Sequence, residues 1–220
     1  MPAKPIKAVW AGVFVLALIG VAAAILRMVI LAKGPRAGPN PAVNAGFAAH
    51  PLLTLVHILP GLLFMLLAPL QFVPTIRARV PRLHRWIGRL VLSLALIIGG
   101  SALVMTFQMA IGGLNEIAAI VLFDLLFLFC VAKGYAAARR RDFAAHREWT
   151  IRMFGIGLGI ATTRPVMGIF FATSRLTHLT PHEFFGIAFW IGFSTTLIAA
   201  ESWVNYTRAR SGNAPASPAG

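Results

Sequence analysis

Residues 117–138 read IAAIVLFDLLFLFCVAKGYAAA, an almost unbroken apolar run that contains one acidic residue, Asp124. A run of about 20 apolar residues is long enough to cross the ~30 Å hydrocarbon core of a bilayer as one helix. Five further runs of this kind lie elsewhere in the chain, at residues 9–31, 51–73, 86–110, 149–172 and 184–206. The sequence therefore predicts an all-α integral membrane protein, built as a bundle of six transmembrane helices.

The composition agrees with this class. Hydrophobic residues make up 58% of the 220-residue chain and charged residues only 12%, with a mean hydropathy of +0.79. An average soluble domain carries about 25% charged residues. We expect a single membrane domain over residues 1–210 and an irregular outer loop at residues 33–46, which are rich in Pro and Gly. The last residues, 211–220, are small and polar and are expected to be disordered.

The basic residues are concentrated on one side of the predicted spans. We expect both termini to lie in the cytoplasm, because fifteen of the twenty Lys and Arg residues then fall in or near cytoplasmic segments, as the positive-inside rule requires. The net charge of +14 is then explained by anionic lipid headgroups at the cytoplasmic face, and nucleic acid is not an expected partner. The first span continues past Arg27, and this length favours an uncleaved anchor over a signal peptide.

Three ionisable residues lie inside the spans on the predicted outer side. At 1.5 Å per residue, His57, Asp124 and Arg164 are all about 9–11 Å deep, on three different spans. Ions inside a bilayer are costly unless they are paired or hydrated. Two interpretations stay open. One is an Asp124–Arg164 ion pair that fixes the helix register, with His57 as a hydrogen-bonded neighbour. The other is a proton-relay or ligand site.

The fifth span carries two further backbone signals. Pro165 follows Arg164 and predicts a kink, because proline removes an amide donor and clashes with the preceding turn. Gly155 and Gly159 are four residues apart, a spacing that predicts close packing of this helix against a neighbour.

A second polar layer is expected near the cytoplasmic ends of the spans. It contains Gln71, Arg89, Arg152 and Glu201, at depths of about 5–8 Å. Glu201 is the only acid in this layer. We therefore expect an inner ion pair between Glu201 and Arg152, with Arg89 as the other possible partner.

Two histidines begin similar strings at the cytoplasmic starts of the third and fifth spans. His84 begins HRWIGR, and His146 begins HREWTIR. Neutral imidazoles on facing helices can ligate haem iron, and arginines can bind the propionates. The sequence thus predicts haem b between His84 and His146, with Arg89 and Arg152 at the propionates. The alternative is that both histidines lie at the interface and contact lipid headgroups.

Several of these strings resemble a family of bacterial membrane proteins known as domain of unknown function 2306. The resemblance rests on His57 with Pro60 and Gly61, the string at residues 84–89, His146 with Arg152, and Thr163-Arg164-Pro165. It extends over roughly residues 50–170 and implies location in the bacterial inner membrane, without implying an activity. The placement of histidines on four central helices is also similar, in architecture alone, to that of the di-haem membrane cytochromes b.

Three classes of function follow from these features. The leading hypothesis is a redox protein with one b-type haem, in which His57, Asp124 and Arg164 form an outer quinone or proton site. The second is a proton-coupled small transporter or lipid-handling protein that uses the same outer cluster. The third is a structural membrane subunit whose buried charges fix only the helix register. The sequence contains no nucleophilic triad, phosphate-binding glycine loop or zinc-ligand spacing.

Overall fold

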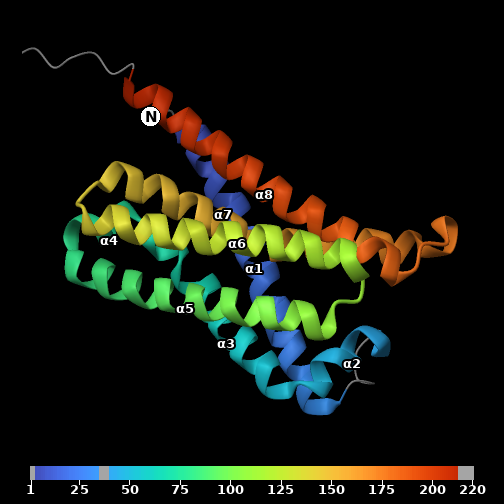
Figure 1. The fold of residues 1–220 in the computed structure, drawn as a ribbon. Helices are drawn as coiled ribbons and strands as arrows, with labels where there is room; N and C mark the ends of the chain where they lie inside the picture. Colours follow the sequence, from blue (N-terminus) through green and yellow to red (C-terminus); the bar gives the residue numbers. More distant parts are fainter. Residues whose placement is uncertain (1–2, 35–39, 213–220) are drawn as a thin grey trace, which may run out of the picture.

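The computed structural model describes residues 3–34 and 40–212, and in these residues it contains helices and no strand. In chain order the elements are α1 (Ala3–Lys33), α2 (Pro41–Ala49), α3 (Pro51–Leu67), the 3-10 helix η2 (Pro69–Phe72), α4 (Pro74–Arg79), α5 (Pro81–Met109), α6 (Gly113–Arg139), α7 (Phe143–Thr177) and α8 (Pro181–Gly212) (Figure 1).

Six of these elements are long and apolar enough to cross a membrane: α1, α3 with η2, α5, α6, α7 and α8. The predicted all-α fold with six membrane helices is confirmed. Several helices extend beyond the limits expected from hydropathy. For example, α5 begins at Pro81 rather than at 86, and α7 begins at Phe143 rather than at 149. The added turns carry interfacial Arg and His residues, which stay helical although they are not apolar.

The expectation of an irregular loop at residues 33–46 is wrong for its second half. Residues 41–49 form α2, because Asn40 caps the helix by accepting a hydrogen bond from the Val43 amide at 3.3 Å, and Pro41 occupies the first turn. Residues 35–39 lie outside the described residues. The predicted disordered tail lies mostly outside them too, at 213–220, whereas α8 continues to Gly212.

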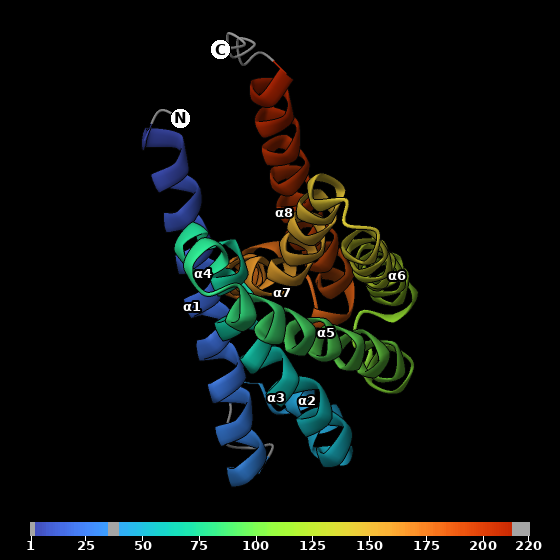
Figure 2. The same ribbon diagram turned by 90° about the vertical axis from the view of Figure 1, so that its left-hand side faces the viewer.

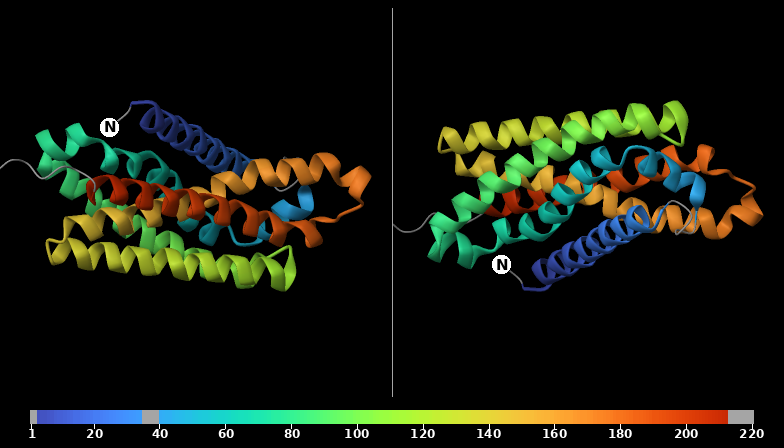
Figure 3. Two further views of the ribbon diagram at one scale, coloured as in Figure 1. Left: turned by 90° about the horizontal axis from the view of Figure 1, so that it is seen from above. Right: turned by 90° about the horizontal axis from the view of Figure 1, so that it is seen from below.

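The helices pack largely in chain order. α5, α6, α7 and α8 each contact the next, α8 also contacts α6, and α3 packs against α5. α1 lies across the outside of this group and contacts both α3 and α7 (Figure 2). The start of α1 and the end of α8 lie at the same end of the bundle as α4 and the α6–α7 turn (Figure 3). We call this the terminal end; the α5–α6 and α7–α8 turns lie at the opposite end.

The core is rich in aromatic residues and glycine. Phe64 of α3 is buried at the centre, with its ring centroid 6.0 Å from that of Phe127 on α6 and 6.2 Å from that of Phe154 on α7. The predicted close approach at Gly155 and Gly159 is confirmed. A Cβ at Gly155 would lie 2.6 Å from the Ala200 Cβ of α8, and one at Gly159 would lie 2.3 Å from a ring carbon of α8. α7 continues as one helix through the proline at 165.

Candidate functional site

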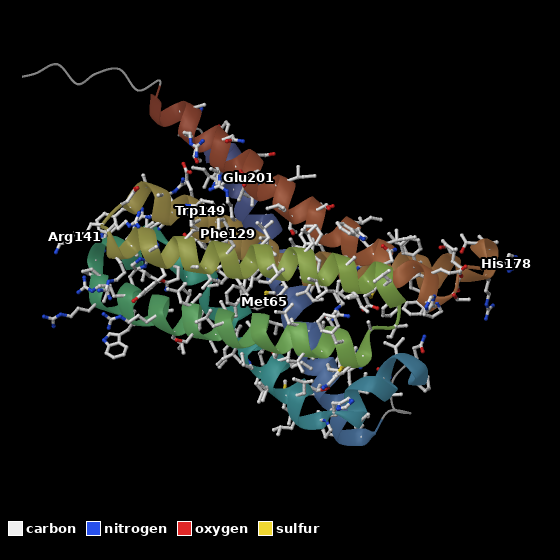
Figure 4. The ribbon with its side chains drawn as sticks, viewed as in Figure 1. Met65, Phe129, Arg141, Trp149, His178 and Glu201 are labelled. Atoms are coloured by element: carbon white, nitrogen blue, oxygen red, sulfur yellow. The ribbon has the colours of Figure 1, made fainter. Side chains whose placement is uncertain are left out.

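An ion-pair cluster joins α7 to α8 near the terminal end. Arg152 donates from Nε to Glu201 Oε1 at 2.5 Å and from a terminal nitrogen to Oε2 at 3.0 Å, so the structure contains the inner pair expected from the sequence. Arg152 also lies 3.7 Å from Glu148, one turn earlier on α7. Glu148 in turn accepts hydrogen bonds from Arg208 of α8. Figure 4 shows Glu201 beside Trp149, whose ring lies against Arg152.

Two histidines from different helices come together at this same end. His84 lies in the first turn of α5 and His146 in the first turn of α7, and the two interact electrostatically. Nδ1 of His146 is 2.8 Å from the Gly134 carbonyl oxygen of α6. Because a carbonyl oxygen only accepts, this nitrogen must carry the proton. The Nε2 of a neutral His146 then has a free lone pair, the arrangement that metal-ligating histidines use.

The surroundings of His84 contain two buried polar atoms without a hydrogen-bond partner among the described residues. These are His84 Nδ1 and the side-chain nitrogen of Gln71. Gly88 is one turn after His84 on the same face of α5, and a Cβ at this glycine would lie 3.1 Å from Gln71 Oε1. The sequence placed Gln71 in the inner layer but gave no sign of its position beside His84. A bound group with an acceptor oxygen could take the hydrogen bond that the Gln71 side-chain nitrogen offers.

The arginines that act on His84 are not the two that the sequence predicted, Arg89 and Arg152. Arg152 is already engaged by two carboxylates, so its expected role at a haem propionate is not supported. Arg89 makes no ion pair within the described residues and lies 5.5 Å from the ring centroid of Trp86. The basic side chains that act electrostatically on His84 are Arg77 of α4 and Arg85 of α5.

The predicted outer cluster is split by the structure. His57 of α3 lies with Nδ1 2.9 Å from Ser101 Oγ of α5. The serine hydroxyl donates to the Ile97 carbonyl at 2.6 Å, so His57 Nδ1 acts as the donor to Ser101. His57 also interacts electrostatically with Arg164 of α7. Depth therefore grouped His57 with an arginine that acts on it electrostatically, but gave no sign of the serine that orients the imidazole.

Asp124 takes no part in that contact. Within residues 3–34 and 40–212, no ion pair joins Asp124 to Arg164, so the register-fixing pair of the first interpretation is absent. Asp124 instead faces α5, with Oδ1 3.3 Å from the place that a Cβ on Gly99 would take, and its Oδ2 is buried without a partner in this part of the chain. The reason is geometric: equal depth does not fix the direction in which a helix presents a side chain.

Arg27 of α1, and not Asp124, is the second charged residue that acts on Arg164. It interacts electrostatically with Arg164, donates to Asn44 Oδ1 of α2 at 2.6 Å, and lies 3.9 Å from the ring centroid of Phe47. In the sequence, Arg27 stands out only as an interruption of the first span. Its position inside an apolar run was the available signal.

The fold and its two polar layers define a polytopic helical membrane protein. The chain belongs to the family described as "Predicted membrane protein (DUF2306)", which it matches over residues 54–204. The matched region begins within α3 and ends within α8, and α1 with Arg27 precedes it. The chain matches no curated protein and no solved structure. No group of three or more His, Cys, Asp or Glu side chains suited to a metal ion occurs within the described ranges.

Proposed function

We propose that this protein is a membrane redox protein that binds one b-type haem between His84 and His146. The observation that carries the proposal is the 2.8 Å hydrogen bond from His146 Nδ1 to the Gly134 carbonyl oxygen. This bond leaves the lone pair of His146 Nε2 available for a metal ion. His146 also interacts electrostatically with His84, the other proposed ligand. A bound haem b would supply one-electron transfer, with the protein controlling its orientation and surroundings.

The chain's own residues provide three features that suit such a group. His84 and His146, which come from separate helices, would be the residues that hold the group. The unpartnered buried nitrogen of Gln71 offers a hydrogen bond to an oxygen of the ligand. Arg77 and Arg85, which act electrostatically on His84, supply positive charge for carboxylate propionates. These two arginines replace Arg152 in our proposal, because Arg152 is paired with Glu201.

The proposed setting is the bacterial inner membrane, with the terminal end in the cytoplasm. The excess of Lys and Arg at this end supports that orientation and contact with anionic lipid headgroups. A quinone is the lipid-soluble electron partner that such a protein would use.

An absorption spectrum of the detergent-purified protein tests the proposal. The protein is expressed in haem-replete cells, and spectra are recorded after oxidation and after reduction with dithionite. We expect a Soret band, sharpened α and β bands on reduction, and about one haem per chain by the pyridine haemochrome assay, since one pair of ligands holds one haem.

His84→Ala and His146→Ala should both lose the bands. His182→Ala, an exposed histidine at the opposite end, is the matched control. Colourless folded protein would overturn the proposal.

One observation favours a second candidate, a proton-coupled transporter or lipid-handling protein. Asp124 is a carboxyl group inside the membrane with one oxygen that has no partner in the described part of the chain. Intramembrane carboxyl groups of this kind commonly carry protons. Proton uptake into vesicles containing the purified protein, lost in Asp124→Asn and retained in His84→Ala, would support this candidate over the redox protein.

A further inference from the structure

His57 stands in α3 one turn before a proline and a glycine, in the string His57-Ile-Leu-Pro60-Gly61. It lies in the half of the bundle away from the terminal end, about 9 Å from the start of α3 at 1.5 Å per residue. The histidine pair of the proposed function uses none of these residues. An imidazole inside the membrane is costly unless it is hydrogen-bonded or serves a ligand.

One ring nitrogen of His57 is fully engaged. Nδ1 is 2.9 Å from Ser101 Oγ, and this oxygen lies 2.6 Å from the Ile97 carbonyl oxygen and 3.0 Å from that of Ile98. A hydroxyl has one proton and a carbonyl oxygen only accepts, so Ser101 donates to a carbonyl and accepts from His57 Nδ1. In the neutral imidazole the other nitrogen, Nε2, then carries no proton and can only accept a hydrogen bond.

This acceptor has no donor within the part of the chain that the structure describes, residues 3–34 and 40–212. Nδ1 holds the ring against Ser101, and no side chain or backbone amide of these residues donates to Nε2. Pro60 adds a second acceptor of the same kind. Because it has no amide hydrogen, the Val56 carbonyl one turn earlier loses its usual intrahelical donor. A ligand that suits this place must therefore bring a hydrogen-bond donor.

The same helix leaves the imidazole uncovered. Gly61 lies one turn after His57 on the same face of α3. Helical side chains lean toward the N-terminus of their helix, so a side chain at residue 61 would cover the turn that contains His57. Among the described residues nothing lies within 4 Å of a Cβ at Gly61, and His57 itself is only half-buried. Space therefore remains beside the ring, with the glycine backbone and the apolar ring of Pro60 next to it.

We propose that His57, Pro60 and Gly61 bind a membrane-soluble molecule that carries a hydroxyl group on a flat ring, the chemistry of a quinol. The hydroxyl group donates to His57 Nε2, and the ring occupies the space that Gly61 leaves. An oxidised quinone has only carbonyl oxygens at the corresponding positions, so it leaves Nε2 without a donor and binds more weakly. The choice of a quinol among ring alcohols rests on the proposed redox function, whereas the need for a donor does not.

Thermal unfolding of the detergent-purified protein tests the site. Melting is measured without oxygen during titration with decylubiquinol or with its dimethyl ether, both with the same excess of reductant. The ether has the same ring and tail but no donor. We expect decylubiquinol to raise the melting temperature of the wild type and to bind about tenfold more tightly than the ether, the effect of one hydrogen bond to a group otherwise left unpaired. Decylubiquinone without reductant is the second compound that lacks a donor and should behave like the ether.

Three variants separate the acceptor from the space beside it. His57→Phe keeps a ring but has no acceptor, and it should lose the preference for decylubiquinol over the ether. Gly61→Leu fills the space and should abolish the response to both compounds. Gly12→Leu is the matched control, because Gly12 is an exposed glycine of α1 with nothing within 4 Å of a Cβ. It should respond as the wild type does.

Ser101 is a positioning residue in this site, since it fixes which ring nitrogen carries the proton. Ser101→Ala should lower the ratio of the two affinities several-fold, a readout that a loss of packing alone would not change. This variant carries the test if His57→Phe does not fold, and an unchanged ratio in Ser101→Ala would then contradict the proposal.

The remaining outcomes also decide. The proposal is overturned if decylubiquinol and the ether stabilise the wild type equally, if neither stabilises it, if folded His57→Phe keeps the preference, or if Gly12→Leu loses the response as Gly61→Leu does. None of these readouts uses haem. Colourless protein that prefers decylubiquinol would keep this site and overturn the haem proposal, and haem-containing protein without the preference would do the reverse.

Discussion

Gly192 of α8 lies against the backbone of Thr163 on α7: a Cβ at residue 192 would be 2.2 Å from Thr163 Oγ1 and 2.8 Å from its amide nitrogen. Thr163 is fully buried, and its hydroxyl donates to the Gly159 carbonyl oxygen at 2.9 Å. Neither atom has room to move aside. The α7–α8 contact, the most extensive in the bundle, therefore depends on the absence of a side chain at this position.

Gly192→Ala should destabilise the protein. The added methyl group meets backbone rather than the end of a flexible side chain, so the helices must separate, at a cost of about 1–3 kcal/mol. Gly168→Ala on α7 is the control, because nothing lies within 4 Å of a Cβ there. It should stabilise slightly through the higher helix propensity of alanine. Melting in detergent measures both; equal melting temperatures would show that the contact is looser than described.

Glu201→Gln should weaken the attachment of α8 to α7. The change removes the charge partner of two Arg152 donors and leaves that arginine with Glu148 alone. We expect a loss of about 1 kcal/mol, since the Glu201 side chain is 40% exposed and solvent screens the pair. The double variant Glu201→Gln with Arg152→Gln should recover part of the loss, because no unpaired charge remains. Thermal melting of Glu201→Gln, Arg152→Gln and the double variant tests this, and a double variant less stable than Glu201→Gln would contradict it.

Hydropathy predicted the number and the order of the membrane helices because a span needs only length and apolar composition. It failed at residues 41–49, where Pro and Ala in a short segment look like a loop but Asn40 and Pro41 start a helix. The Asn-Pro pair is the signal that would have predicted α2. This signal consists of only two residues, and the Pro- and Gly-rich composition of the surrounding segment favours a loop.

Side-chain partners were harder to predict than depth. The pair Arg152–Glu201 was foreseen because only one acid lies in the inner layer. Asp124 and Arg164 lie at matching depth too, yet the rotation of each helix about its axis turns Asp124 toward α5. Arg27 was missed because the packing of α1 against α3 and α7 is a property of the whole bundle, and no motif in α1 encodes it.

Asp124→Asn and Arg164→Gln should act independently. With no ion pair between them, the double variant should show the sum of the two single effects to within about 0.5 kcal/mol. A double-mutant cycle on the free energy of unfolding, in lipid-free detergent, measures the coupling. A coupling above about 1 kcal/mol would mean that the two residues pair in the membrane after all.

The orientation of the bundle is testable with a membrane-impermeant maleimide. Cys130 is the single cysteine of the chain and is buried, so a Cys130→Ala background provides an unlabelled reference. Single cysteines at two exposed positions, Arg140 in the α6–α7 turn and Thr177 at the opposite end of α7, report on the two sides.

Arginine-rich turns face the cytoplasm, so in intact cells only Thr177→Cys should react, and both should react after lysis. Figure 4 shows Arg141 and His178, the neighbours of these positions, at opposite ends of the bundle. Labelling of Arg140→Cys alone in intact cells would reverse the topology and place the histidine pair on the outer side.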